Sequence, residues 1–141
     1  MTEQTKKSNP WWKEVLKTLA PVIVVLGIFK LIAFSYAPAP LDHAELERAR
    51  ASDEPVLLEF HASWCSTCLI QRNSLNYVYR DPAFSKIRRF TLNYDVEKQL
   101  ETDFHVTSQS TLILLRGRKE LARTVGTVSP SELSGFLKHA L

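Results

Sequence analysis

The sequence is poor in the residues that build stapled or metal-rich proteins. Two of its 141 residues are cysteines, four are histidines, and its one methionine is the first residue. Two cysteines are too few for a disulfide-stapled scaffold, and so few sulfur and imidazole ligands leave little material for an elaborate metal site. Hydrophobic residues make up 45% of the chain and charged residues 23%. This balance excludes a fully disordered chain, a collagen and a multi-span membrane protein, and the length fits one small domain with an appendage.

The larger part of the chain also lacks an excess of charge of either sign. Residues 1–40 contain five lysines and two glutamates, whereas residues 41–141 contain thirteen basic and thirteen acidic residues. The formal net charge of +3 therefore comes from the N-terminal segment. Because nucleic-acid binding needs a cationic face on the folded domain, we expect no nucleic-acid partner.

One long apolar run stands near the N-terminus. Residues 18–37 contain a single charged residue, Lys30, and as a helix these twenty residues would match the thickness of a bilayer core. Lysines precede the run, and Trp11 and Trp12 are placed like interfacial anchors. The run predicts an uncleaved single-pass anchor in the inner (cytoplasmic) membrane, with the N-terminus in the cytoplasm by the positive-inside rule.

These features divide the chain into four parts. They are a cytoplasmic segment (1–17), a transmembrane anchor (18–37), a linker (38–41) and a folded domain (42–141) on the periplasmic or extracellular side. A cleaved signal peptide is the first alternative, but a proline follows each candidate cleavage site, Ala37 and Ala39. A buried helix of a soluble protein is the second alternative.

Hydrophobic periodicity in the folded part predicts an α/β domain. The predicted elements are a helix over 42–52, a strand over 55–61, a helix over 65–80, a strand over 89–94, a helix over 96–104, a hairpin of strands 111–116 and 121–125, and a helix over 129–141. Asp42 and Asp95 are the expected N-caps of two of these helices. Such an order gives a small mixed sheet flanked by helices.

The two cysteines form the motif Cys65-Ser66-Thr67-Cys68, directly after the strand predicted at 55–61. This spacing places both sulfurs on one side of a helix, one turn apart, where they can form a disulfide. The helix start favours a thiolate at Cys65, which would attack a partner disulfide, and Cys68 would then resolve the mixed disulfide. Half of a zinc site, a structural disulfide and an inert buried pair are the alternatives.

The stretch from Val56 to Cys68 resembles the active-site strand and helix start of thioredoxins. The similarity continues at 92–95, at 111–115 and from Gly126 to the last helix, and so covers residues 42–141. The segment Asp81-Pro82-Ala83-Phe84 further resembles the membrane-linked periplasmic branch of the family, such as the C-terminal domain of DsbD. The resemblance implies a thioredoxin-like fold and a protein-disulfide oxidoreductase without a cofactor.

Carried over to matching positions, the resemblance makes Cys65 the nucleophile, Cys68 the resolving thiol and Trp64 the packing residue beside them. Glu59 falls where thioredoxins keep a buried acid beneath the cysteine pair. A carboxyl group inside this apolar strand should have a raised pKa and would take the proton from Cys68. The alternative places Glu59 in solvent at a strand edge.

The sequence departs from the family at Ser110, where thioredoxins have a cis-proline just before a threonine. Because a cis bond before a non-proline residue costs about 2.5–4 kcal/mol, we expect a trans peptide between Gln109 and Ser110. With Trp64, these two residues are the candidate substrate-binding residues. The hydroxyl of Ser110 would tune the thiolate or admit a metal ion, and the alternative is a loop residue without a chemical role.

The leading hypothesis is therefore a membrane-anchored thiol–disulfide oxidoreductase that acts on cysteine pairs of exported proteins. A membrane electron donor is a further candidate partner, and family analogy favours the reducing direction slightly. The second hypothesis is a carrier of Cu(I) or another soft metal that uses the same cysteines with His61 or His105. A structural adaptor that docks a partner without turnover is the third.

Overall fold

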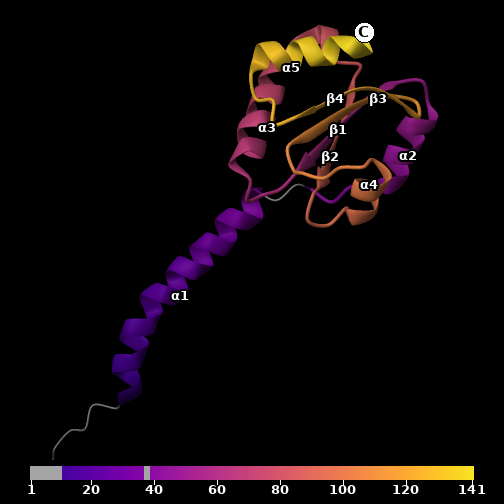
Figure 1. The fold of residues 1–141 in the computed structure, drawn as a ribbon. Coiled ribbons are helices and arrows are strands. Elements are labelled where there is room, and N and C mark those ends of the chain that lie inside the picture. The colour runs from indigo at the N-terminus through magenta and orange to yellow at the C-terminus, as the bar shows by residue number, and fades with distance from the viewer. Residues whose placement is uncertain (1–10, 37–38) are drawn as a thin grey trace, which may run out of the picture. The chain divides into compact units, whose positions relative to one another are not determined.

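The computed structural model of the chain describes residues 11–36 and 39–141. The chain divides into two units, Met1–Tyr36 and Ala37–Leu141. The first contains helix α1 (Trp11–Tyr36), which includes Pro21. The second contains the strands and the other helices of the described residues (Figure 1).

Helix α1 begins seven residues before the apolar run predicted as an anchor. Within residues 11–36 and 39–141, no helix combines the length and the hydrophobicity that crossing a membrane requires. This finding goes against the transmembrane anchor predicted for residues 18–37, whose apolar run is interrupted by Lys30. The last residue of that run and most of the predicted cytoplasmic segment, residues 1–10, lie outside the described residues.

The second unit is built on a mixed four-stranded sheet with the strand order β2-β1-β3-β4. The strands are β1 (Pro55–His61), β2 (Arg88–Asn93), β3 (Thr111–Arg116) and β4 (Lys119–Val125). Strand β1 pairs in parallel with β2 and antiparallel with β3. The register places Glu59 of β1 between Thr91 and Leu112 of its two neighbours. The predicted α/β class with a small mixed sheet is confirmed.

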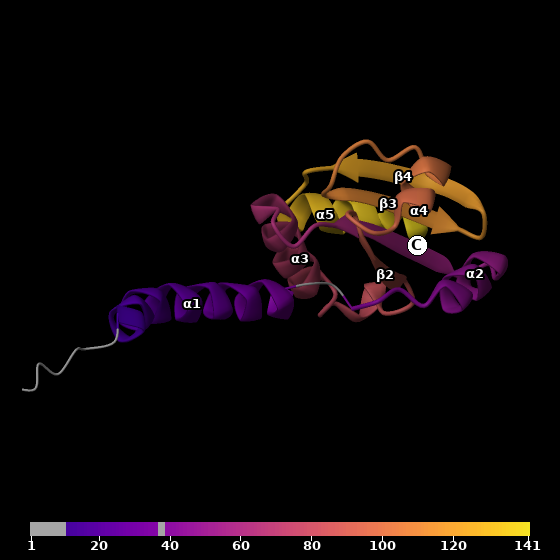
Figure 2. The same ribbon diagram turned by 90° about the horizontal axis from the view of Figure 1, so that it is seen from below.

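Helices cover both faces of this sheet (Figures 1 and 2). Helices α3 (Ser66–Val78) and α5 (Pro130–Leu137) pack on one face, and α2 (His43–Ala51) and α4 (Lys98–Asp103) lie on the other. Because side chains alternate along a strand, Leu57 of β1 joins the core under α3, whereas Leu58 and Phe60 join the core under α2. Alternation therefore also turns Glu59 and His61 toward α3.

All eight predicted elements are present, and six of them differ from the prediction at one or both ends. Strands β1 and β3 have the predicted bounds, and the Asp42 carboxylate caps α2 by accepting from the Glu45 N–H at 2.9 Å. Helix α4 begins at Lys98 and not at 96, and the Asp95 carboxylate accepts from the Trp64 indole and does not cap the helix. Strand β4 begins at Lys119, two residues early, and α5 ends at Leu137 before a 3₁₀ turn.

Candidate active site

The two cysteines lie where strand β1 gives way to helix α3. The Cys65 N–H donates to the carbonyl of Ala62 at 3.2 Å, which closes the turn after the strand. Cys65 is then the N-cap of α3, and its Sγ accepts from the Cys68 N–H at 3.1 Å. Both cysteines are free thiols, with Cys65 8% and Cys68 1% exposed. Cys65 is thus the outer sulfur at the positive end of the helix, and Cys68 is the inner one.

The surroundings shift the pKa values of the two thiols in opposite directions. Burial raises the pKa of Cys65, but hydrogen bonds from Cys68 and Ser110 and from backbone N–H groups outweigh it and leave the pKa below its ordinary value. Burial raises the pKa of Cys68, and its hydrogen bond with Cys65 adds to the increase. The outer sulfur therefore ionises first, as its place at the helix start predicts.

Ser110 brings a hydroxyl group to both sulfurs. The side chain is buried, and its Oγ lies 3.0 Å from the Cys68 Sγ and 3.6 Å from the Cys65 Sγ. The backbone of Ser110 has a φ of 59°, a left-handed conformation. The described residues contain no cis peptide bond, in agreement with the trans bond expected after Gln109. At the position where thioredoxins have a proline, Ser110 therefore places a hydroxyl group in contact with the sulfurs of Cys65 and Cys68.

Glu59 is buried as expected, but its carboxylate forms ion pairs with Arg89 and Arg72. Its Oε2 accepts from Nε and Nη2 of Arg89 at 2.9 Å and 2.5 Å, and its Oε1 lies 3.7 Å from Nε of Arg72. Burial raises the pKa of Glu59, but the neighbouring His61 ring, the charges of both arginines and the hydrogen bonds from Arg89 outweigh it and lower the pKa. The predicted raised pKa is therefore wrong, because the sequence does not reveal partners from other elements.

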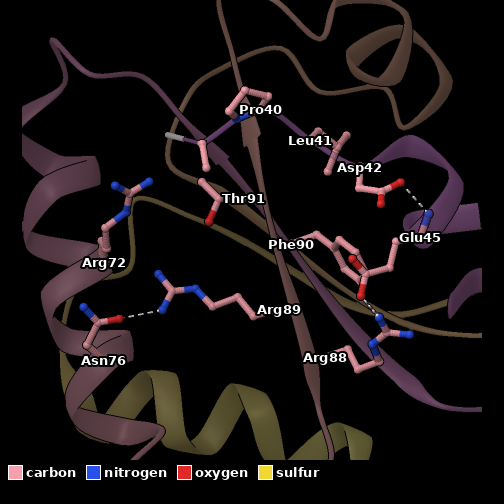
Figure 3. Close-up of a pocket in the computed structure, with 11 residues that line it drawn as sticks. Pro40, Leu41, Asp42, Glu45, Arg72, Asn76, Arg88, Arg89, Phe90 and Thr91 are labelled. Carbon is pink, nitrogen blue, oxygen red and sulfur yellow. Dashed lines mark hydrogen bonds and ion pairs between the residues drawn. The ribbon is translucent and has the colours of Figure 1, made fainter. Parts of the chain in front are cut away.

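A pocket of about 630 Å³ lies beside this charged network. Figure 3 shows Arg72 and Asn76 of α3 facing Arg89 of β2, with a hydrogen bond of 2.7 Å from the guanidinium of Arg89 to Asn76. Ala39 and Pro40, from the predicted linker, also line it. Neither the cysteines nor Ser110 line this pocket, so it is separate from the sulfurs.

Two further predicted residues lie at the surface near the cysteines. Trp64 is 63% exposed, and its indole N–H donates to the Asp95 carboxylate at 2.9 Å, which fixes the ring beside Cys65. Gln109 is partly buried on the loop directly before Ser110. Both are therefore accessible to another chain, and their part in substrate binding stays a prediction.

The histidines do not complete a metal site with the cysteines. His61 is buried, and its Nδ1 lies 3.7 Å from the Oε1 of Glu59. His105 is exposed at the end of α4 and has a φ of 53°. Within the part of the chain that the structure describes, no three histidine, cysteine, aspartate or glutamate residues are grouped to hold a metal ion.

Sequence reasoning missed Gln71, which joins α3 to the Ser110 loop. It is fully buried, and its Nε2 donates to the carbonyl oxygens of Ser110 at 3.2 Å and Thr127 at 2.9 Å. Its position was a usable signal, because a residue three places after Cys68 lies on the same face of a helix. An amide on that face, turned toward the sheet, needs a polar partner in the core.

A free cysteine pair at a helix start after the central strand of a mixed sheet defines a thiol–disulfide oxidoreductase. The model of the Thioredoxin family matches residues 39–139, so the chain belongs to the thioredoxin family. The thioredoxin of Alicyclobacillus acidocaldarius is 28% identical over 105 residues, which cover 74% of this chain and 99% of the relative. The thioredoxin of Pseudomonas aeruginosa is 33% identical over 86 residues, covering 61% and 79%.

A solved structure is similar in sequence and fold. Trxlp from Edwardsiella tarda is 41% identical with a TM-score of 0.66, and the match covers 70% of this chain and 95% of that chain. Membership of the family identifies the Cys65–Cys68 pair as the redox centre of a protein-disulfide oxidoreductase.

Proposed function

We propose that the protein exchanges disulfides with exported proteins through Cys65 and Cys68, preferentially as a reductant. One observation carries the exchange itself, whereas the reducing direction and the exported substrates rest on analogy with anchored members of the family. Cys65 is placed at the N-terminus of α3 with its pKa lowered, and Cys68 follows one turn later with its pKa raised. Such a pair supplies an attacking thiolate and a second thiol that stays protonated until it is needed.

The exchange proceeds in two steps. The Cys65 thiolate attacks one sulfur of the partner's disulfide, the partner's S–S bond breaks, and its other sulfur leaves as a thiolate that takes up a proton. Cys68 then loses its proton and attacks the Sγ of Cys65, which releases the second partner sulfur and leaves a Cys65–Cys68 disulfide. Two electrons pass from the pair to the partner, and the reverse sequence oxidises a dithiol.

The partner's chain is proposed to dock beside the outer sulfur. Trp64 offers an exposed ring that its hydrogen bond to Asp95 holds in place. Val96, which is 67% exposed, adds apolar surface one residue after Asp95, and Gln109 adds a polar group next to Ser110. Amphipathic and apolar side chains around a reactive atom favour a polypeptide over a small polar substrate.

A redox titration of the full chain tests the proposed exchange. The purified protein, equilibrated with mixtures of reduced and oxidised glutathione, is expected to convert reversibly between a dithiol and an intramolecular disulfide in one two-electron transition. Alkylation followed by mass spectrometry measures the reduced fraction. Parallel assays with Cu(I) test the rival function: stoichiometric copper binding by a chain that shows no glutathione-dependent transition would replace the oxidoreductase by a metal carrier.

We further propose that the domain works on the periplasmic or extracellular side of the cytoplasmic membrane, and that α1, which does not meet the requirements for a span over its described residues, associates with the bilayer surface. The described apolar side chains of α1 support this proposal, because Val22, Ile23 and Phe29 are 53%, 65% and 69% exposed. Between Leu19 and Phe29 the helix carries no charged or polar side chain, and such a stretch favours a non-aqueous surrounding. This location would give access to exported proteins and to a membrane electron donor.

Reporter fusions test this location. An enzyme that is active only outside the cytoplasm, fused after residue 141, is expected to be active, and the fusion is expected to sediment with membranes. Removal of residues 1–36 should abolish both the reporter's activity and the sedimentation. A second reporter that is active only in the cytoplasm is fused at the same position. Activity of this second fusion would contradict the proposed location.

A further inference from the structure

The resolving thiol, Cys68, has a hydroxyl group as its close side-chain partner where the sequence predicts a carboxyl group. The Ser110 Oγ lies 3.0 Å from the Cys68 Sγ. The Glu59 carboxylate instead contacts Arg89, Arg72, Thr91 and His61. A carboxylate whose pKa is lowered by two arginines is a weak proton acceptor for a thiol. The side-chain oxygen that lies within hydrogen-bonding distance of the Cys68 sulfur is that of Ser110.

We propose that the Ser110 hydroxyl stabilises the Cys68 thiolate as it forms during release of the partner, and that Gln71 positions this hydroxyl. The inference rests on the proposed exchange through Cys65 and Cys68. It makes Ser110 a catalytic residue, because its Oγ contacts the reacting sulfur, and Gln71 a positioning residue, because it acts through Ser110.

The distances allow one hydroxyl to serve both sulfurs in turn. A serine hydroxyl rotates to suit its acceptor, and Ser110 Oγ lies within reach of Cys65 Sγ at 3.6 Å as well as of Cys68 Sγ. In the dithiol state the O–H donates to the Cys65 thiolate. Once Cys65 is bonded to the partner it carries no charge, so the O–H turns to Cys68. The proton of Cys68 passes to water, the new S–S bond forms with Cys65, and the partner's sulfur leaves with the electron pair.

The backbone of Ser110 is fixed by hydrogen bonds on both sides. Its N–H donates to the carbonyl of Phe60 at 2.9 Å, and its carbonyl accepts from the Gly126 N–H at 3.0 Å and from Nε2 of Gln71 at 3.2 Å. A left-handed φ of 59° is unfavourable for a residue with a side chain, so these bonds are what maintain it.

Gln71 ties this loop to the helix that carries the resolving thiol. It follows Cys68 by three residues on α3, and its second N–H donates to the Thr127 carbonyl, which anchors the amide in place. Because Cys68 and Gln71 lie on the same face of α3, the hydrogen bond from Gln71 to the Ser110 loop keeps the Ser110 hydroxyl at a constant position relative to the Cys68 sulfur. A thiolate that is stabilised by a fixed donor requires no rearrangement of the site as it forms.

The experiment follows the two steps separately with an aromatic disulfide, 5,5′-dithiobis(2-nitrobenzoate). Attack by Cys65 releases the first coloured thiolate, and resolution by Cys68 releases the second, so rapid mixing of the full chain resolves two phases. In Ser110→Ala the second phase is expected to be about tenfold slower, since hydrogen bonds to charged groups are the stronger kind. Its pH profile should shift to higher pH, whereas the first phase should change less because the Cys68 N–H still donates to Cys65.

Gln71→Met tests the positioning role. It keeps a long side chain but removes both N–H donors, and we expect the second phase to slow in the same direction as in Ser110→Ala. In a double variant with Ser110→Ala, the Gln71 substitution should add no further slowing. The matched control is Leu75→Met, one turn further along the buried face of α3, which should leave both phases and the pH profile unchanged.

The outcomes separate this inference from the proposed function. Absence of both phases in the unaltered chain would contradict the exchange reaction itself. Two normal phases in the unaltered chain, with an unchanged second phase in Ser110→Ala, would overturn the role of Ser110 alone. Additive slowing in the double variant would show that Gln71 acts on α3 and not through Ser110, and would overturn its positioning role.

Discussion

Cys65→Ser is expected to abolish disulfide exchange, whereas Cys68→Ser is expected to trap the partner protein. Cys65 is the outer sulfur with the lowered pKa, so its removal eliminates the attacking thiolate, and we expect turnover to fall on the order of a thousandfold or more. Cys68 is the inner sulfur with the raised pKa. Without it the first attack still occurs, but nothing resolves the mixed disulfide between Cys65 and the partner.

Electrophoresis under non-reducing conditions checks this asymmetry. Each variant of the full chain is mixed with a disulfide-bonded test protein and quenched with acid and an alkylating agent. Cys68→Ser should give a covalent adduct that a reductant dissolves, and Cys65→Ser should give none. Adducts of similar amount from both variants would mean that the helix start does not distinguish the two sulfurs.

The sequence alone was enough to predict the parts of the site that depend on local order. A short apolar strand followed by two cysteines spaced by one helical turn fixes where Cys65 and Cys68 lie on their elements. The apolar periodicity likewise predicted β1 and β3 with the observed bounds. These features depend on residues that are neighbours in the chain, so propensity and spacing decide them.

The parts that sequence reasoning missed depend on contacts between distant segments. Glu59 was expected to be a buried acid with a raised pKa, but α3 contributes Arg72 and β2 contributes Arg89, thirteen and thirty residues further on. Asp95 was expected to cap a helix, but Trp64 from another loop binds its carboxylate. In both cases a charged group is satisfied by whichever donor the folded chain brings closest, and local pattern does not reveal that donor.

Glu59→Gln is expected to destabilise the fold by roughly 2–4 kcal/mol, between the values typical of surface pairs and of fully buried pairs. The carboxylate is 1% exposed, while the side chains of Arg89 and Arg72 are 18% and 23% exposed. A neutral amide leaves both guanidinium groups without a counter-charge in a partly desolvated site. The matched control is Glu120→Gln, whose pair with Arg123 is more exposed, and which should cost under about 1 kcal/mol.

Denaturant unfolding at a series of pH values then decides the charge state of Glu59. Because its pKa in the folded protein is lowered from the ordinary 4.5, its contribution to stability is fully present above about that pH and is lost as the pH falls through the folded-state pKa. The free-energy difference between the unaltered chain and Glu59→Gln should therefore be largest near neutral pH and shrink on acidification below 4.5. A raised pKa, which burial alone would give, predicts the opposite: an unpaired buried carboxylate would make the unaltered chain the less stable of the two at neutral pH. Greater stability of Glu59→Gln at neutral pH would thus restore Glu59 as a candidate proton acceptor for Cys68.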